Sequence, residues 1–476
     1  MNIHECLSVC VAASNRSLHK GVSHALKASA LAAFLLFALS FALAQDAIYS
    51  HQPDPLTPDS TAPIKKPMIM PGEVVIPASS QVNAADRGKR AHTNVRYVLP
   101  VFSSPDEAPP YTGYAYETPA SLACVYGIVT ALTGCNPNTV TNTPSGGSQS
   151  IAIVDAYDDP SAQSDLAYFS AQFGLPFSPE KFVVVYQDGV QPLQDYTGGW
   201  ELEESLDIEY SHAMAPNAKL YLVEAQSNSD SDLFASVQIA TYLVQCGKVT
   251  ACPAATVAHP WTKGEISMSW GESEFSGETT FDSTMAQTGV VFFASAGDSP
   301  GTIYPCVSPN VVCAGGTSTS RSLTTGNLLK EISWSDAGGG ISQYEAIPSY
   351  QSSVAAVKAI VGTKRGAPDL SSDANPYTGV WVYDSFPQYG EFFSSSWWIV
   401  GGTSVSSPTL AGIVNNAGTF NASTNAELTE IYKNLGVVAD FNDITSGACN
   451  YYMSSSAVAG YDLCTGVGSP KGKVGK

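Results

Sequence analysis

The segment 401–408 holds the strongest candidate for a nucleophile. It reads Gly-Gly-Thr-Ser-Val-Ser-Ser-Pro, it precedes the helix-like stretch 409–416, and it places Ser404 shortly after two glycines. A serine at a helix N-terminus can point its hydroxyl into a cleft, beside backbone N–H groups that could stabilise an oxyanion. The alternative for Ser404 is an ordinary N-cap serine in a Gly-Ser-rich loop. Catalysis would also require a group that activates the hydroxyl.

Histidine is the usual activator of a serine nucleophile. Beyond residue 115 the sequence offers only His212 and His259. Neither has the glycine-flanked setting of a catalytic histidine of the subtilisin type, so we expect both to be structural. The search for an activating base therefore moves to carboxylates.

Glu203 and Asp207 lie four residues apart in the helix-like segment 203–209, so a helix would place them on one face. Two carboxyl groups this close do not easily both ionise, so they would share a proton and titrate as a unit. Such a pair could act as a general base at acidic pH, where histidine is protonated. The alternative is a solvated acidic helix face.

Asp298 follows the apolar run Val-Phe-Phe-Ala-Ser-Ala-Gly directly. A buried strand in an α/β sheet delivers its last residues to the edge where such folds place their sites. Protonated, Asp298 could donate a hydrogen bond to an oxyanion; alternatively, it caps the following turn.

The elements that must position these residues are short apolar runs that alternate with helix-like stretches. Continuous β-rich runs are typical of strands buried on both faces of a parallel sheet. They occur at 150–155, 182–186, 219–224, 265–270, 290–296 and 311–315. The alternation predicts one layered α/β domain over 116–476, with a mostly parallel central sheet flanked by helices.

Residues 45–115 are Pro-rich and lack periodicity, which favours a loosely ordered lead-in or short propeptide. The basic cluster 87–90 within them is either a processing site or a solvated turn.

The N-terminus indicates export. Lys20 and Lys27 precede the apolar run 28–44, which ends in Ala-Leu-Ala before Gln45, so residues 1–44 read as a signal peptide. An uncleaved membrane anchor is the alternative, although the run is short for a span.

The cysteines beyond the leader fall as close neighbours, which in an oxidising compartment favours local disulfides. Sequential pairing is our preferred interpretation: Cys124 with Cys135, Cys246 with Cys252, Cys306 with Cys313, and Cys449 with Cys464.

The composition limits the class of partner. The chain has 476 residues, 13% of them charged, and a formal net charge of −20. This acidity disfavours nucleic acid and anionic membranes as partners, because both are bound through basic patches. Few lysines and many neutral polar residues suit an acidic medium.

Taken together, the segments resemble the sedolisin family, the serine-carboxyl peptidases. The serine segment is similar to the family's SGTSxxxP signature, with Gly401 in place of its first serine, and 203–207 resembles its ExxxD segment. Residues 296–299 resemble the segment that carries the oxyanion aspartate. Further family-like segments occur at 338–342, 348–351 and 365–369, and the resemblance runs from about residue 116 to 470 in the family's order.

The resemblance implies a subtilisin-like α/β fold and a role for each catalytic position. Ser404 would be the nucleophile, Glu203 the general base with Asp207 hydrogen-bonded behind it, and Asp298 the protonated stabiliser of the oxyanion. Activity would then be confined to acidic pH. Asp155, at the end of the first strand, would extend the carboxyl network, and Trp270 would shield it; plain packing is the alternative for both.

The C-terminal segment resembles the family's calcium loop, which implies Ca²⁺ as a cofactor. Oxygen ligands suit this ion; here they would be the side chains of Asp443 and Asp462 and the carbonyls of Ile444, Val458 and Gly460. Relatives often carry glycine where Val458 stands. The bridge Cys449–Cys464 would clamp the same loop.

We therefore expect a secreted, calcium-stabilised, acid-acting endopeptidase that cleaves proteins or peptides, is extracellular or periplasmic, and is monomeric. Two alternatives stay open: a subtilisin-type peptidase using Asp155, His212 and Ser404, and an inactive secreted binding protein on the same scaffold. One departure from the family matters most. Relatives usually carry a long folded prodomain, and 45–115 is too short for one.

Overall fold

The computed structural model describes residues 72–98, 108–110, 114–130, 132–257, 260, 262–386, 396–449 and 455–475. All of them fall within one compact unit, Leu56–Lys476. The predicted signal peptide and His259 lie outside the described residues.

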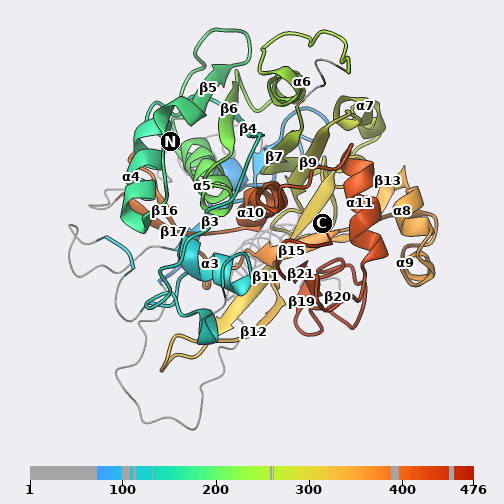
Figure 1. The fold of residues 1–476 in the computed structure, drawn as a ribbon. Coiled ribbons are helices and arrows are strands. Elements are labelled where there is room, and N and C mark those ends of the chain that lie inside the picture. The colour runs from blue at the N-terminus through green and yellow to red at the C-terminus, as the bar shows by residue number, and fades with distance from the viewer. Residues whose placement is uncertain are drawn as a thin grey trace, which may run out of the picture. The chain divides into compact units, whose positions relative to one another are not determined.

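A central sheet organises the described residues (Figure 1). Its eight strands run in the order β12-β11-β9-β7-β4-β6-β5, with β15 also paired to β11. All pairs are parallel except the one between β11 and β12. The strands are β4 (Ser150–Ala156), β5 (Phe182–Tyr186), β6 (Lys219–Ala225), β7 (Gly264–Met268), β9 (Val290–Ser295), β11 (Val312–Arg321), β12 (Leu328–Ser333) and β15 (Leu370–Asp373). The predicted mostly parallel α/β fold is confirmed.

Helices cover both faces of this sheet because successive side chains of each strand point to opposite sides. Ala152 and Val154 of β4 belong to the core packed against α6 (Asp230–Cys246). Ile151 and Ile153 belong to the opposite core, which contains Leu410 of α10 (Thr403–Ala417). This two-sided burial explains why the strands read as continuous apolar runs.

The helix α5 (Gly199–Met214) packs against α10 and is buried along its whole length. In Figure 1 the two helices lie next to each other at the centre of the fold. A β-carbon on Gly412 of α10 would lie 2.6 Å from the β-carbon of Met214 and 2.9 Å from the carbonyl oxygen of Ser211. Glycine at this position therefore permits the close approach of the two helices. α4 (Ala162–Phe173) packs on the far side of α5.

Residues 74–98 are more ordered than their sequence indicates. β1 (Val74–Val75) and β3 (Arg96–Val98) join β17 (Trp397–Gly401) and β16 (Val380–Tyr383) in one sheet, and β2 (His92–Thr93) pairs with β8 (Trp270–Ser273). β1, β2 and β3 are two or three residues long, and β2 and β3 are stabilised by partners far away in the sequence. They therefore leave no periodic pattern that could be recognised in the sequence.

Several shorter elements complete the described fold. The remaining helices are α3 (Pro119–Val125), α7 (Asp282–Met285), α8 (Ser349–Ser352), α9 (Ala355–Val361) and α11 (Thr424–Lys433). The remaining strands are β10 (Ile303–Tyr304), β13 (Gly340–Ala346), β14 (Lys364–Ala367), β18 (Phe441–Asn442), β19 (Ala448–Cys449), β20 (Ser455–Ser456) and β21 (Ser469–Pro470). No helix among the described residues is long and apolar enough to cross a membrane.

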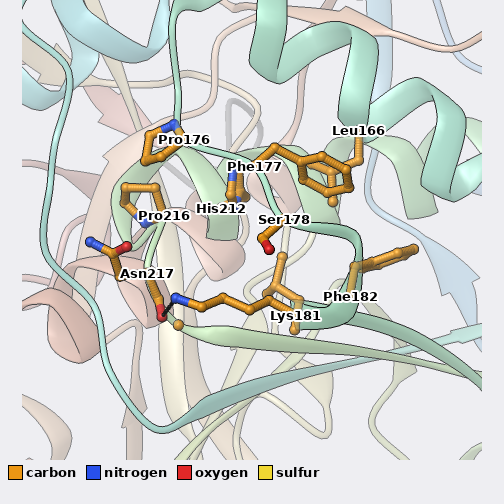
Figure 2. Close-up of a pocket in the computed structure, with 11 residues that line it drawn as sticks. Leu166, Pro176, Phe177, Ser178, Lys181, Phe182, His212, Pro216 and Asn217 are labelled. Carbon is orange, nitrogen blue, oxygen red and sulfur yellow. Dashed lines mark hydrogen bonds between the residues drawn. The ribbon is translucent and has the colours of Figure 1, made fainter.

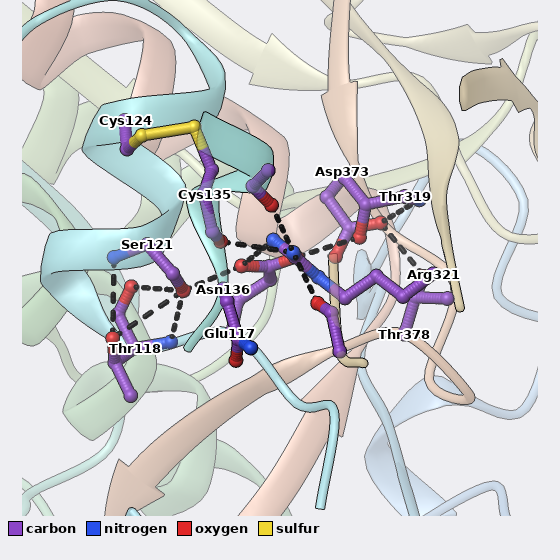
Figure 3. A network of polar contacts seen from close by, with 12 residues as sticks. Glu117, Thr118, Ser121, Cys124, Cys135, Asn136, Thr319, Arg321, Asp373 and Thr378 are labelled. Atoms are coloured by element: carbon purple, nitrogen blue, oxygen red, sulfur yellow. Dashed lines mark hydrogen bonds and ion pairs between the residues drawn. A yellow bond between two sulfur atoms is a disulfide. The ribbon is translucent and has the colours of Figure 1, made fainter. Parts of the chain in front are cut away.

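Local disulfides and a buried ion pair between distant segments crosslink the described fold. All four sequential cysteine pairs are bonded, as the spacing favours. Near the first of them, the guanidinium of Arg321 contacts the carboxylate of Glu117 at 2.5 Å, with both side chains almost fully buried (Figure 3). Arg321 also donates to the carbonyls of Gly134 and Cys135. This network fixes the start of α3 against β11.

Candidate active site

Ser404 is the second residue of α10, immediately after the turn that ends β17. Gly402 adopts a φ of +104°, a backbone region that L side chains rarely enter. A β-carbon there would also lie 2.0 Å from the carbonyl oxygen of Asn94 and 2.6 Å from Oδ2 of Asp298. The glycine therefore allows both groups to approach the nucleophile. The Ser404 hydroxyl is buried and donates to the carbonyl of Ser269 at 3.2 Å.

Glu203 and Asp207 project from α5 and are fully buried, which excludes a solvated acidic face. The hydroxyl of Ser269 donates to Oδ1 of Asp207 at 2.7 Å. Neither carboxylate oxygen of Glu203 has a hydrogen-bond partner, yet the Ser404 side chain lies near enough to lower the pKa of Glu203. Catalytic hydrogen bonds are commonly long before substrate binds.

Burial dominates the electrostatics of this carboxyl pair. It raises the pKa of Glu203 well above its usual range, and repulsion from Asp207 and Asp155 raises it further. Burial also raises the pKa of Asp207, against the opposing effect of the Ser269 hydrogen bond. Both carboxyls therefore hold a proton to a higher pH than free side chains do, and each ionisation disfavours the other.

Asp298 follows β9 and reaches the start of α10. Its Oδ1 accepts hydrogen bonds from the backbone N–H of Thr403 at 2.7 Å and from the Thr403 hydroxyl at 2.9 Å. Its Oδ2 is buried without a hydrogen-bond partner. Burial raises the pKa of Asp298 to about 7, although the Arg96 guanidinium opposes the shift. Below neutral pH the side chain is therefore a carboxylic acid that can donate a hydrogen bond.

Asp155 and Trp270 lie beside this cluster. Asp155 stands opposite Glu224 in the parallel pair β4–β6, and its two oxygens are buried without partners. Burial raises the pKa of Asp155, and repulsion from Asp207 and Glu224 adds to the increase. The indole N–H of Trp270 donates to the carbonyl of Val154 at 2.7 Å, which fixes the ring next to the strand end.

His212 lies at the other end of α5, in a separate pocket that Leu166, Phe177 and Leu220 line (Figure 2). Burial lowers the pKa of His212 to about 4. Leu220, which lines the pocket of His212, lies near the start of β6. Glu224, which pairs with Asp155, lies four residues further along the same strand, roughly 13 Å from Leu220. The structure therefore does not bring His212 together with Asp155, and the triad required by the subtilisin-type alternative is not assembled.

The predicted calcium residues meet in one C-terminal loop. Oδ2 of Asp443 accepts from the N–H of Gly460 at 3.0 Å, while its Oδ1 is buried without a partner. Asp462 accepts from the N–H of Val458 at 3.0 Å, and Ile444 is buried beside the loop. The described residues contain no cluster of three or more acidic, histidine or cysteine side chains that could hold a metal. The partnerless oxygen of Asp443 has the chemistry that a hard cation prefers in a ligand.

Two residues of the segment 45–115 contact the site and were not predicted from the sequence, Asn94 and Arg96. Asn94 places its carbonyl 3.1 Å from the N–H of Ser404. Arg96 donates to the carbonyl of Asp298 and contacts Asp336 at 2.5 Å. Neither residue lies in a motif, and both belong to a segment without periodicity. The only available signal was that Arg96 is one of few cationic residues in an acidic chain.

Comparison with known proteins identifies the relatives of this chain. No protein-family model matches it. Kumamolisin of Bacillus sp. (strain MN-32) is 30% identical over 366 residues, covering 69% of this chain and 59% of that protein. Sedolisin of Pseudomonas sp. (strain 101) is 29% identical over 238 residues, covering 43% and 38%, respectively. The matched part of the chain thus spans less than two thirds of either relative's length.

A solved structure agrees with these matches. The structure of Pseudomonas sedolisin, a serine-carboxyl proteinase complexed with two molecules of pseudo-iodotyrostatin, matches with a TM-score of 0.55 and 23% identity. The match covers 75% of this chain and 95% of that one, which establishes a common fold. The sequence relatives and the shared fold lead to one conclusion: the chain belongs to the sedolisin family of serine-carboxyl peptidases.

Proposed function

We propose that the protein is a secreted endopeptidase that hydrolyses peptide bonds in proteins at acidic pH through Ser404. One observation carries the proposal: the Ser404 hydroxyl lies among buried carboxyls whose pKa values are raised, with His212 in a different pocket. The family relation and the name of the structural relative, a serine-carboxyl proteinase, support the same chemistry.

In the proposed mechanism Glu203 takes the proton of the Ser404 hydroxyl as the oxygen attacks the substrate carbonyl. Glu203 acts from the form of the pair that holds one proton, carried by Asp207, and one negative charge. The Ser404 N–H and the protonated Asp298 donate to the developing oxyanion. Glu203 then returns its proton to the leaving amine, and water hydrolyses the acyl-enzyme by the same route.

Export and calcium binding are parts of the same proposal. Four disulfides among the described residues support an oxidising, extracellular location. Asp443 and Asp462, with the carbonyls of Ile444, Val458 and Gly460, would hold Ca²⁺, which would supply only structural crosslinking of the loop. The protein would act as a monomer on protein or peptide substrates.

The replacement Glu203→Gln tests the proposed base. It should lower kcat for hydrolysis of a denatured protein at about pH 4 by roughly 10²- to 10⁴-fold, because the amide cannot accept the serine proton. Glu209→Gln is the matched control. Glu209 lies on the same helix, is equally buried, and has a pKa raised by burial, but it accepts from the N–H of Tyr383. Full activity of the Glu203 variant, or equal loss in the control, would refute the assignment.

A further inference from the structure

The guanidinium of Arg96 lies beside the carboxyl group of Asp298. Its Nε is 3.7 Å from Oδ2 of Asp298, and neither atom has a hydrogen-bond partner among the described residues. The guanidinium also donates to the backbone carbonyl of Asp298. Both side chains are more than nine-tenths buried, so their charges interact through the protein and are screened little by water.

A second carboxylate, that of Asp336, holds the same guanidinium. Nη1 of Arg96 contacts Oδ2 of Asp336 at 2.5 Å, and the guanidinium carbon lies 5.2 Å from the centre of the Trp334 ring. A cation over the face of a tryptophan is stabilised most where water is excluded. Asp336 and Trp334, which follow β12, therefore fix the guanidinium next to Asp298.

The strand that carries Arg96 is packed into the fold. β3 pairs antiparallel with β17, and the side chains of Val95, Tyr97 and Val98 are almost fully buried. These three residues belong to the same hydrophobic core as Ile399 of β17. Burial of the apolar neighbours therefore holds Arg96 in place beside the site.

Groups from four parts of the chain act on the charge of Asp298. Burial, the largest effect, and the carboxylate of Asp336 raise the pKa of Asp298, whereas the Arg96 guanidinium and the two hydrogen bonds from Thr403 of α10 lower it. Glu203 of α5 lies near enough that it and Asp298 repel each other when both are ionised. Arg96 and Asp336 thus oppose each other at Asp298, and neither takes part in the proposed proton transfers.

We propose that Arg96 and Asp336 are positioning residues of the proposed peptidase, whose opposite charges set the highest pH at which Asp298 still donates to the oxyanion. The inference rests on the proposed function. Arg96 favours the carboxylate form, which accepts hydrogen bonds but cannot donate one, and so confines activity to acidic pH. Asp336 offsets part of that positive charge and extends activity towards neutral pH.

The pH dependence of kcat/KM for a peptide substrate tests the two charges separately. Arg96→Gln should move the alkaline limb, the pH at which kcat/KM falls to half its maximum, upwards by about one pH unit. An arginine beside an aspartate lowers the pKa of the carboxyl by roughly 1 to 3, and this effect is then lost. Asp336→Asn should move the same limb downwards, because the guanidinium is left uncompensated. The acidic limb, which reports the proposed base pair, should stay in place in both variants.

Two further variants separate charge from packing. Arg96→Lys keeps the positive charge and should hold the alkaline limb closer to that of the wild type than Arg96→Gln does. Arg321→Gln breaks another buried ion pair, the contact with Glu117 at 2.5 Å, and should lower the Tm while leaving the limb unchanged. Thermal unfolding curves show which variants are folded; if Arg96→Gln is not, Arg96→Lys and Asp336→Asn carry the decision.

The outcomes separate this inference from the proposed function. Intact-mass measurement of each assayed enzyme establishes whether residue 96 is present. An active chain that begins beyond residue 96 and keeps the same alkaline limb would overturn the inference. Unchanged limbs in both variants, shifts in the same direction, or an equal shift in Arg321→Gln would overturn it as well. In all these cases an acidic optimum that depends on Ser404 leaves the proposed function standing, whereas a wild-type chain inactive at every pH would contradict both.

Discussion

Two carboxyl groups near Ser404, those of Glu203 and Asp298, have different proposed roles because they differ in protonation. In the proposed mechanism Glu203 accepts a proton while Asp298 keeps one, and burial raises the pKa of both. Burial raises the pKa of Asp298 to about 7, against the Arg96 guanidinium and the two hydrogen bonds that Oδ1 accepts from Thr403, which lower it. Oδ2 accepts no hydrogen bond and lies 3.7 Å from Nε of Arg96; in the proposed mechanism it is the oxygen that carries the acidic hydrogen.

Removal of this donor should lower turnover more than substrate binding. Asp298→Ala should reduce kcat at about pH 4 by roughly 10²- to 10³-fold with little change in KM, because the hydrogen bond strengthens only as the oxyanion forms. Steady-state kinetics with a peptide substrate would measure both constants. A rise in KM with kcat unchanged would show that Asp298 only binds substrate.

Residue types alone left each catalytic candidate open, and the structure explains why. The segment 203–209 is as polar as a solvated helix face, and it is buried because α5 packs against α10, α4, β4 and further elements. Asn94 and Arg96 could not be found because strands of two or three residues carry no periodicity. The continuous apolar runs, by contrast, predicted the central strands, because a strand buried on both faces consists of consecutive apolar residues.

At the scale of elements, the site depends on a helix pair and a strand-to-helix turn. α5 supplies Glu203 and Asp207, α10 supplies Ser404, and Gly412 allows the two helices to approach closely. Gly402 provides the turn that only glycine adopts without strain. The parallel sheet fixes β9, and therefore Asp298, at the same end of the fold.

The loop that carries Asp443 and Asp462 should behave as a calcium-binding element. Calcium bound at a concentration of roughly 100 Kd should add about 2.7 kcal/mol to the free energy of unfolding. Chelation with EDTA should remove this contribution and lower the Tm of the Ser404→Ala protein. Asp443→Asn should have a lower Tm in calcium and respond little to EDTA. Asp440→Asn, in the preceding segment, is the control and should respond like its parent. An EDTA effect that is equal in both variants would argue against the proposed ligands.

At the scale of the whole molecule, the number and burial of the carboxyl groups support the proposed action in an acidic medium. Its formal net charge is −20, and many of its carboxyls are buried rather than solvated. Burial raises the pKa well above the usual range for a set that includes Asp155, Glu203, Glu204, Asp207, Glu209, Glu265 and Asp373. In the unfolded chain the same groups titrate near pH 4.

Stability should therefore fall as the pH rises. Above about pH 4 the folded state binds more protons than the unfolded state, so the free energy of unfolding decreases with pH until the buried groups titrate. For Glu224 this decrease continues to about pH 9, because burial and the nearby Asp158 raise its pKa to about 9. Thermal unfolding of the Ser404→Ala protein at fixed calcium should give a higher Tm at about pH 4.5 than at about pH 8. An equal or higher Tm at the alkaline pH would contradict the burial of protonated carboxyls.

The pH profile of protein hydrolysis tests the central claim most directly. Denatured protein is digested between about pH 2 and about pH 9 by the wild-type chain and by Ser404→Ala. We predict an acidic optimum, a decline as Asp298 loses its proton near pH 7, and no activity above background in the variant at any pH. A maximum near pH 8, or a variant as active as the wild type, would contradict the serine-carboxyl mechanism.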